Sequence, residues 1–264
     1  MKRDVLDHGF VELIDHMGSD QRIVDAARVS ISGDQVKPSS TNRHLIRYLV
    51  RNSHTTPLES VKFTFAVKAP IFVIRQAFRH RAASYNEMSA RYSVIPEEFY
   101  VPDLSRMNVQ AKDNHQGSGA ETVPDPAYVA ALIRNQSKLA FDTYHELLNT
   151  GLSRELARSV LPVNTYSQYY WTVDLWNLMH FLRLRLDGHA QYEIRVYGEA
   201  ILDLIREHVP LAVEAFEDYI LDAKKFSGKE LSILSVNEHF TDDILEQKLG
   251  SKREVQEFKD KLGV

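Results

Sequence analysis

The chain has 264 residues, of which 44% are hydrophobic, and it carries a formal net charge of -4 at pH 7. Its length allows one large or two modest domains, and we expect neither a secretory leader nor a membrane span, hence a cytoplasmic protein. The acidic balance argues against a nucleic acid polymer as partner, and the absence of cysteine excludes disulfides, thiolate metal sites and a cysteine nucleophile.

Hydrophobic periodicity predicts the first elements of the chain. Apolar residues recur at helical spacing over residues 20–30 and 41–52, which predicts two helices. Over residues 59–68, large apolar residues alternate with polar or small ones, which predicts a half-buried strand.

A further helix is predicted over residues 71–80, because Pro70 stands where a helix can begin. Gln76, Arg79 and His80 are three and four residues apart, so they would share one face of this helix. We expect that polar face to meet a ligand while the apolar face anchors the helix.

Residues 79–92 form the most informative segment, because they combine three arginines with serine, histidine and asparagine side chains. Hydrogen-bond donors in such excess are typical of sites for phosphate or carboxylate groups. Taken singly, Arg79, Arg81 and Arg91 could be surface residues in ordinary ion pairs. Their fixed spacing relative to Ser84 and Ser89 favours ligand binding.

Residues 103–126 are rich in Asp, Asn, Gly, Ser and Pro and are predicted to form a loop. Gly117 and Gly119 resemble part of a dinucleotide fingerprint, but the third glycine and the preceding strand are missing. Beyond this loop the pattern predicts a strand over 166–173 and helices over 127–148, 153–161, 175–186 and 190–208. Residues beyond about 220 receive no function.

The spacing of Arg79-His80-Arg81, followed by seven residues and then Ser89-x-Arg91-Tyr92, resembles the signature of the flavin-dependent thymidylate synthases, the ThyX family. Other motifs resemble that family in the same order, over roughly residues 1–220. They are Gly9 to Leu13, Ala26 to Ser30, His54-x-Thr56-Pro57-Leu58-Glu59, Ala69 to Val73, Leu156-Ala157-Arg158-x-x-Leu161-Pro162 and Asp187-x-His189-Ala190-Gln191-x-Glu193.

This resemblance implies an α+β fold, with helices packed on a small, largely antiparallel sheet. It implies a catalytic domain over residues 1–220 and a C-terminal extension of unknown role over 221–264. The implied reaction is the reductive methylation of dUMP at C5 to dTMP, with FAD as cofactor, methylenetetrahydrofolate as one-carbon donor and NADPH as reductant. It also implies a homotetramer whose sites lie between subunits.

The resemblance assigns site residues by matching positions. The residues implied for dUMP are Gln76, Arg79, Glu87, Ser89, Arg91, Arg158 and Arg185. Those implied for FAD are Thr56, Arg79, His80, Arg81, Glu87 and His180. Arg185 and His54 are the candidate catalytic residues, and the Arg185 guanidinium would stabilise negative charge on the pyrimidine ring.

Asp174 and His180 depart from the family pattern, since many relatives carry asparagine at both positions. An ionised acid beside a flavin or its phosphates is unfavourable, so Asp174 is expected to point away from the cofactor.

Several alternatives compete with this interpretation. A non-catalytic nucleotide- or RNA-binding module could use the same arginines, with Tyr85 and Tyr92 stacking on bases. His189 and Glu193 are four residues apart, but two ligands are too few for a metal, and pairing on a helix surface is favoured. We therefore expect no metal. Ser89 lacks an adjacent base, so phosphate binding is favoured over a role as nucleophile.

Overall fold

The computed structural model describes residues 1–29, 39–112, 116–236 and 240–263. The chain forms two compact units, Met1–Leu221 and Asp222–Val264. No helix in these described stretches combines the length and the apolar character needed to cross a membrane.

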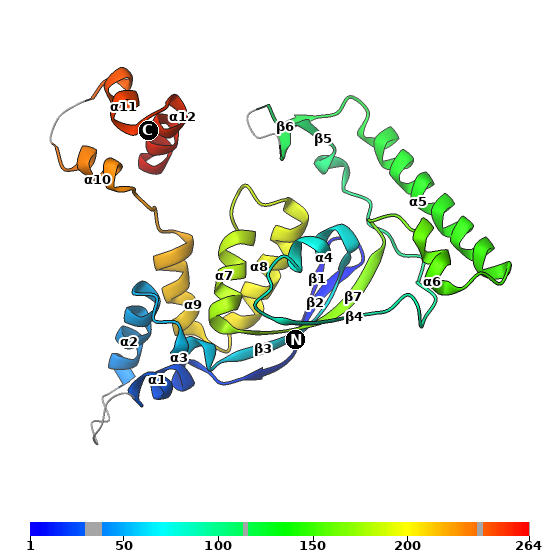
Figure 1. Ribbon diagram of the computed structural model, residues 1–264, viewed down its shortest axis with the longest axis horizontal. Coiled ribbons are helices and arrows are strands. Elements are labelled where there is room, and N and C mark those ends of the chain that lie inside the picture. The colour runs from blue at the N-terminus through cyan, green and yellow to red at the C-terminus, as the bar shows by residue number, and fades with distance from the viewer. Residues whose placement is uncertain (30–38, 113–115, 237–239, 264) are drawn as a thin grey trace. The chain divides into compact units, whose positions relative to one another are not determined.

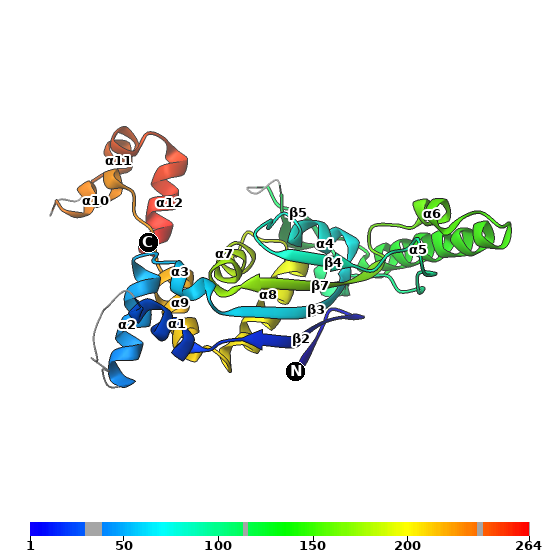
Figure 2. The same ribbon diagram turned by 60° about the horizontal axis from the view of Figure 1, so that its bottom comes forward.

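An antiparallel sheet organises the first unit (Figure 1, Figure 2). Within the described residues, its five strands follow the order β1 (Lys2–Val5), β2 (Gly9–Met17), β3 (Lys62–Pro70), β7 (Tyr166–Asp174) and β4 (Ser84–Glu87). Every neighbouring pair is antiparallel. Together with the helices packed on it, this sheet confirms the predicted α+β class.

The two central strands alternate between a buried and an exposed face. In β3, Phe63 and Phe65 are fully buried, whereas Thr64 between them is only partly covered. In β7, Trp171 is buried and its neighbour Thr172 is exposed. The Thr64 and Thr172 hydroxyls lie opposite each other and share a 3.0 Å hydrogen bond. The period of two predicted β3, although Ala66 is buried as well, and the aromatic and β-branched residues of 166–173 predicted β7.

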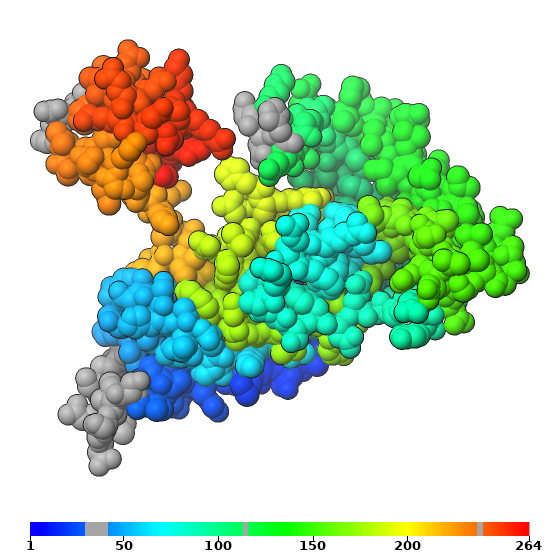
Figure 3. All heavy atoms as spheres, in the orientation of Figure 1, coloured from blue at the N-terminus to red at the C-terminus, as the bar shows by residue number. Residues whose placement is uncertain are grey.

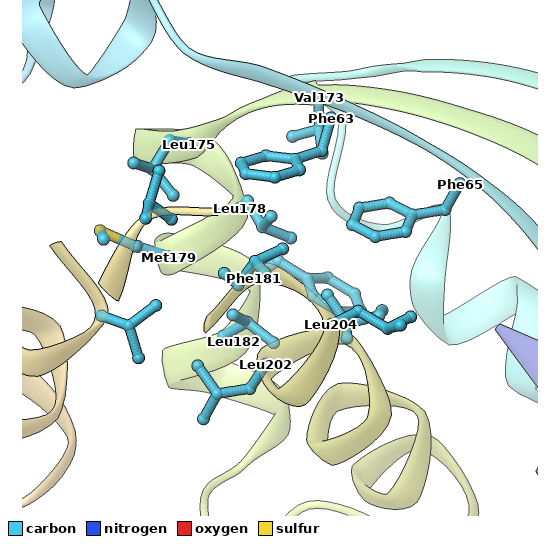
Figure 4. Close-up of a cluster of buried hydrophobic side chains, with 14 of the residues drawn as sticks. Phe63, Phe65, Val173, Leu175, Leu178, Met179, Phe181, Leu182, Leu202 and Leu204 are labelled. Carbon is cyan, nitrogen blue, oxygen red and sulfur yellow. The ribbon is translucent and has the colours of Figure 1, made fainter. Parts of the chain in front are cut away.

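Helices α7 (Leu175–Arg185) and α8 (Tyr192–Arg206) supply much of the apolar layer against the buried face. Figure 4 shows Phe63 and Phe65 of β3 lying toward Phe181 of α7. Both helices were predicted, with ends that differ by a few residues. The core they form fixes the end of α7, where Arg185 lies.

The remaining helices of this core are short or amphipathic. They are α1 (Asp20–Arg28), α2 (Ser39–Arg51), α3 (Thr56–Glu59), α4 (Ile71–Ala77) and α9 (Pro210–Phe216). The predicted helices over 20–30 and 41–52 correspond to α1 and α2, while Ser30 lies outside the described residues.

Helix α4 is shorter than the predicted helix over residues 71–80. It ends at Ala77, and the chain then turns, so that Arg79 and His80 lie outside the helix. The prediction that Gln76, Arg79 and His80 share one helical face is therefore wrong. The chain leaves the helix there because residues 84–87 pair with β7, and the Tyr85 hydroxyl donates a 2.6 Å hydrogen bond to the His80 carbonyl within the turn.

A second apolar cluster lies around α5 (Pro126–Asn149) and α6 (Arg154–Ala157). Its buried members are Ile95, Phe141, Tyr144 and Ala157. The helix predicted over 153–161 is divided here, because a 3₁₀ turn, Arg158–Val160, follows α6.

Two short strands, β5 (Asn108–Gln110) and β6 (Ser118–Thr122), pair where a loop was expected. Gly119 lies within β6 and not between a strand and a helix, which agrees with setting aside a dinucleotide fingerprint. Part of that predicted loop, residues 113–115, lies outside the described residues.

The second unit contains α10 (Gly228–Leu234), α11 (Asp242–Leu249) and α12 (Lys252–Leu262). These helices bury a core of their own, formed by Ile233, Leu245, Leu249, Val255 and Phe258. Ser227 and Glu230 form a capping box that satisfies backbone donors at the start of α10.

Candidate active site

The arginine-rich segment begins with a turn between α4 and β4. Because β4 pairs with β7, Tyr85 lies opposite Trp171, and its hydroxyl reaches back to the His80 carbonyl. Arg79 and Arg81 flank His80 and are exposed. Figure 3 shows this part of the chain, in cyan, at the surface of the first unit. Two exposed guanidiniums beside a buried imidazole suit an anionic ligand.

His80 is only 8% exposed, and its Nε2 atom has no hydrogen-bond partner within the described part of the chain. Its ring meets the rings of His180 and Phe181 edge-on, with centroids 5.6 and 5.7 Å away. Burial lowers the pKa of His80, and the nearby His180 and Arg185 lower it further. The side chain is therefore a neutral imidazole near pH 7 that has one unpaired polar atom.

Arg185 lies at the end of α7 and is partly buried. Its Nη2 atom donates a 2.9 Å hydrogen bond to the Gln76 carbonyl, whereas its buried Nε atom has no partner among the described residues. Burial lowers the pKa of Arg185, and the positive charge of Arg79 acts in the same direction. A buried donor without a partner costs about 1–3 kcal/mol, which a ligand acceptor would recover.

Gln76 connects this cluster to a chain of polar side chains. Its Nε2 atom donates to Gln191 at 2.6 Å, and Gln191 donates to Glu193 at 2.7 Å. Glu193 also accepts a 3.1 Å hydrogen bond from Tyr100. The structure therefore joins Gln76 and Arg185 by a hydrogen bond. His80 and His180 belong to the same cluster through ring contact, and the charge of Arg79 acts on Arg185. Sequence reasoning did not identify Gln191 or Tyr100 as site residues.

A second cluster lines a pocket of about 490 Å³ between the end of β4 and the α6 region. Glu87 and Arg158 are both on its wall. Glu87 accepts a 2.7 Å hydrogen bond from the hydroxyl of Ser167, which is buried in β7. The pocket therefore offers both acidic and basic groups to a polar ligand.

Arg91 lies near this pocket and is paired with an acidic wall residue. Its Nη2 atom is 2.7 Å from Glu155, and the two side chains are 54% and 55% exposed. The backbone N–H of Arg91 donates a 3.3 Å hydrogen bond to the Ser89 hydroxyl. Arg158 donates a 3.3 Å hydrogen bond to the carbonyl of Glu155. We call the two guanidiniums of Arg91 and Arg158, together with the Ser89 hydroxyl, the basic rim. The carboxylate of Glu155 is the main charge that competes with an anionic ligand for this rim.

His54 and Thr56 occupy a third location, where α2 leads into α3. His54 is exposed and meets Tyr48 edge-on at 5.3 Å, and Thr56 is the exposed first residue of α3. Within the described ranges, no hydrogen bond or ring contact joins either residue to the first two clusters. Direct contacts within the described part of one chain therefore do not connect all the predicted site residues.

Asp174 caps the start of α7. Its carboxylate accepts hydrogen bonds from the backbone N–H and the side-chain amide of Asn177, at 3.0 and 2.8 Å. These bonds give the acid a structural role at the helix N-terminus. The predicted role of His180 in FAD binding stays a prediction, and its ring lies exposed beside His80.

The pairing of His189 with Glu193 on one helix surface is wrong. His189 precedes α8 and contacts Asp187 at 2.9 Å, whereas Glu193 is buried within α8. The reason is that the helix begins only at Tyr192. Among the described residues, no group of three or more His, Asp or Glu side chains is placed to hold a metal ion.

Comparison with known proteins places these clusters in a family context. The sequence model of a family described as "Thymidylate synthase complementing protein" matches residues 12–211. A flavin-dependent thymidylate synthase of Wolbachia pipientis wMel is 50% identical over 232 residues, which cover 87% of this chain and 81% of the relative. One from Thermus thermophilus is 50% identical over 230 residues, which cover 87% and 83%.

A flavin-dependent thymidylate synthase of Ruegeria pomeroyi is 45% identical over 266 residues, which cover 98% of this chain and 87% of the relative. The crystal structure of the UMP/dUMP methylase PolB from Streptomyces cacaoi, bound with 5-Br dUMP, matches with a TM-score of 0.75. It is 38% identical and covers 83% of this chain and 99% of that chain. These matches confirm the resemblance found in the motifs, and the chain belongs to the thymidylate synthase complementing protein family.

Proposed function

We propose that this protein is a flavin-dependent thymidylate synthase, which methylates dUMP at C5 to give dTMP. The one-carbon donor is methylenetetrahydrofolate and the reductant is NADPH. The observation that carries the proposal is the pair of unpaired buried atoms, Arg185 Nε and His80 Nε2, beside an arginine-rich turn in a chain of this family. Membership of the family favours catalysis over a binding module.

The nucleotide would bind across the first two clusters. Arg91, Arg158 and Ser89 form the basic rim that suits its phosphate, and Gln76 and Arg185 would hold the rest of the molecule. A partly buried guanidinium stabilises negative charge on a pyrimidine ring more strongly than an exposed one. We therefore assign Arg185 the catalytic role, while Arg79 and Glu87 complete the substrate site.

The residues around the His80 turn fit a FAD cofactor. Arg79 and Arg81 are exposed cations suited to its phosphates, and neutral His80 with His180 offers ring contacts. Thr56 and Glu87 would add polar contacts from other elements. When bound, FAD supplies the reducing hydride, which agrees with a chain that has no cysteine nucleophile.

We further propose a homotetramer whose sites lie between subunits. Within the described residues His54 and Thr56 make no hydrogen bond or ring contact with the other clusters, which supports this, because a neighbouring subunit could bring the missing groups. In this proposal residues 1–220 form the catalytic part, 221–264 form an extension, and the reaction takes place in the cytoplasm. A single subunit would then be inactive.

The visible absorption spectrum of the purified protein tests the proposal. We expect oxidised-flavin bands that bleach with NADPH without oxygen and return when dUMP and methylenetetrahydrofolate are added, with dTMP formed. A colourless protein that binds nucleotide but takes up no added FAD would contradict the proposal and support a binding module instead.

A further inference from the structure

A chain of hydrogen bonds runs from a buried carboxylate to Gln76. Tyr100 donates to one Glu193 oxygen at 3.1 Å, and Gln191 donates to the other at 2.7 Å. Gln76 then donates to the side-chain oxygen of Gln191 at 2.6 Å. The four side chains come from a loop, the start of α8, the turn before it and α4, so only the fold brings them together.

Glu193 is the fixed end of this series of hydrogen bonds. It is 6% exposed, and no basic side chain pairs with it among the described residues. Burial and the nearby Glu193 both raise the pKa of Tyr100, so the Tyr100 hydroxyl keeps its proton and acts as a donor. A carboxylate that accepts at both oxygens requires donors on both sides. Gln191 must therefore turn its NH₂ group toward Glu193.

This orientation passes along the chain because each amide has one donor end and one acceptor end. With its NH₂ group on Glu193, Gln191 presents its oxygen to Gln76. Gln76 in turn directs its NH₂ group at Gln191, which leaves the Gln76 side-chain oxygen facing away. In the part of the chain that the structure describes, no donor contacts that oxygen.

The free oxygen belongs to the residue that also holds Arg185. The Gln76 backbone carbonyl accepts the 2.9 Å hydrogen bond from Arg185, and the Gln76 side chain is partly exposed. Gln191 is exposed in the isolated chain, so a bound ligand would also shield this link from water. A ligand beside Arg185 thus meets an oriented acceptor.

We infer that Glu193 determines substrate specificity from a distance, by fixing through Gln191 the orientation of the Gln76 amide so that it accepts a hydrogen bond from the nucleotide. This inference rests on the proposed function, because it takes dUMP as the ligand. Two groups of dUMP can donate such a bond, namely the N3–H of the base and the 3′-hydroxyl of the sugar. Glu193 is a positioning residue, since it acts only through Gln191 and Gln76.

The variant Glu193→Gln would reverse the direction of donation along this series of hydrogen bonds. With its oxygen on Tyr100, the new amide would point its NH₂ group at Gln191, which would turn over and donate to Gln76. Gln76 would then present a donor to the ligand in place of an acceptor. A change of one atom in a buried residue thereby alters which nucleotide is preferred.

The experiment is a calorimetric titration of flavin-loaded wild type and Glu193→Gln with dUMP, N3-methyl-dUMP and 2′,3′-dideoxyuridine monophosphate. In the wild type, we expect affinity about tenfold lower for the analogue that lacks the contacted donor. In Glu193→Gln, dUMP should bind about tenfold more weakly and this discrimination should disappear. The analogue that responds identifies the donor, and steric effects of the added methyl group cancel between the two proteins.

Tyr100→Phe is the matched control, because it removes one bond to Glu193 without reversing the amides, and it should keep the discrimination. If Glu193→Gln does not fold, Gln191→Met removes the hydrogen bonds that link Glu193 to Gln76 and should reduce the discrimination. Discrimination in Glu193→Gln or Gln191→Met equal to that of the wild type, or no discrimination in the wild type, would overturn the inference alone. A wild type that binds no dUMP would instead refute the proposed function, and the inference with it.

Discussion

The Tyr85 hydroxyl donates a 2.6 Å hydrogen bond to the backbone carbonyl of His80, five residues earlier in the chain. The Tyr85 ring lies parallel to Trp171, with centroids 6.1 Å apart and an angle of 8° between the planes. Burial raises the pKa of Tyr85 to about 12, so its hydroxyl remains a donor at any physiological pH. This contact holds the turn that carries Arg79 and Arg81 against the sheet.

Removing that hydroxyl should loosen the turn and weaken flavin binding. A neutral hydrogen bond contributes about 0.5–1.5 kcal/mol, so Tyr85→Phe should raise the flavin dissociation constant about 2- to 10-fold. Absorbance titration of the flavin-free protein with FAD measures this change. Tyr92→Phe is the control, because Tyr92 is 80% exposed. Equal dissociation constants for Tyr85→Phe and wild type would show that the bond does not position the turn.

Arg185→Ala should abolish thymidylate formation while leaving bound flavin largely intact. The guanidinium is held by the Gln76 carbonyl and directs an unpaired Nε atom into the cluster, which suits it to charge on the substrate ring. Loss of one such donor typically lowers kcat by about 10²- to 10³-fold. Rates of dTMP formation and flavin content measure the two effects separately.

Arg183→Ala serves as the control for that experiment, since Arg183 is on the same helix and exposed. It should keep nearly full activity. If Arg185→Ala lost its FAD, the assignment of Arg185 to the substrate would be wrong, and a cofactor role would replace it.

The alternation of residues predicted β3, and the aromatic and β-branched residues of 166–173 predicted β7. The sequence pattern did not predict β4, whose residues Ser84–Glu87 are polar and form a strand only through pairing with β7. It extended α4 too far for the same reason, since the chain leaves the helix after Ala77 to reach β4. Local periodicity carries no information on such contacts.

The same limit applies to the site. The resemblance to the family singled out Arg79, His80 and Arg185, which the fold brings close together. Sequence reasoning missed Gln191 and Tyr100, because they meet only through Glu193 in the folded chain. One available signal was that Gln191 and Glu193 lie within a motif shared with the family, although their chemistry could not be read without Gln76.

Glu155→Gln should increase affinity for dUMP. Glu155 lines the pocket and pairs with Arg91, so its charge both repels a phosphate and occupies a guanidinium that would bind it. We expect the dissociation constant for dUMP to fall about 3- to 10-fold, with little change in melting temperature because exposed ion pairs add little stability. Calorimetry on the flavin-loaded protein measures this affinity.

Glu199→Gln is the matched control for charge, because Glu199 is exposed and pairs with Arg195 at 3.8 Å on α8. Its affinity for dUMP should equal that of the wild type. A Glu155→Gln protein that bound dUMP more weakly would mean that Glu155 orients Arg91 for the ligand and does not compete with it.

The stability of the fold should fall in mild acid because of His208. Its ring lies 4.0 Å from that of His16, and its buried Nε2 atom has no partner in the described residues. Burial lowers the pKa of His208, the nearby His16 lowers it further, and Glu207 opposes the shift. The unfolded chain therefore binds more protons at this position between the lowered pKa and about pH 6.5. The contribution of neutral His208 to the free energy of unfolding is therefore fully present above about pH 6.5, and it is lost as the pH falls toward the lowered pKa.

His208→Gln should accordingly flatten the fall of the melting temperature between about pH 7 and pH 5. The comparison with wild type is essential, because carboxylates and other histidines titrate in the same interval and contribute equally to both proteins. His44→Gln provides the control, since His44 is exposed on α2 and its loss should leave the wild-type slope unchanged. If His208→Gln and wild type lost stability in parallel, the contact between His208 and His16 would carry no pH dependence, and acid sensitivity would have to arise elsewhere in the fold.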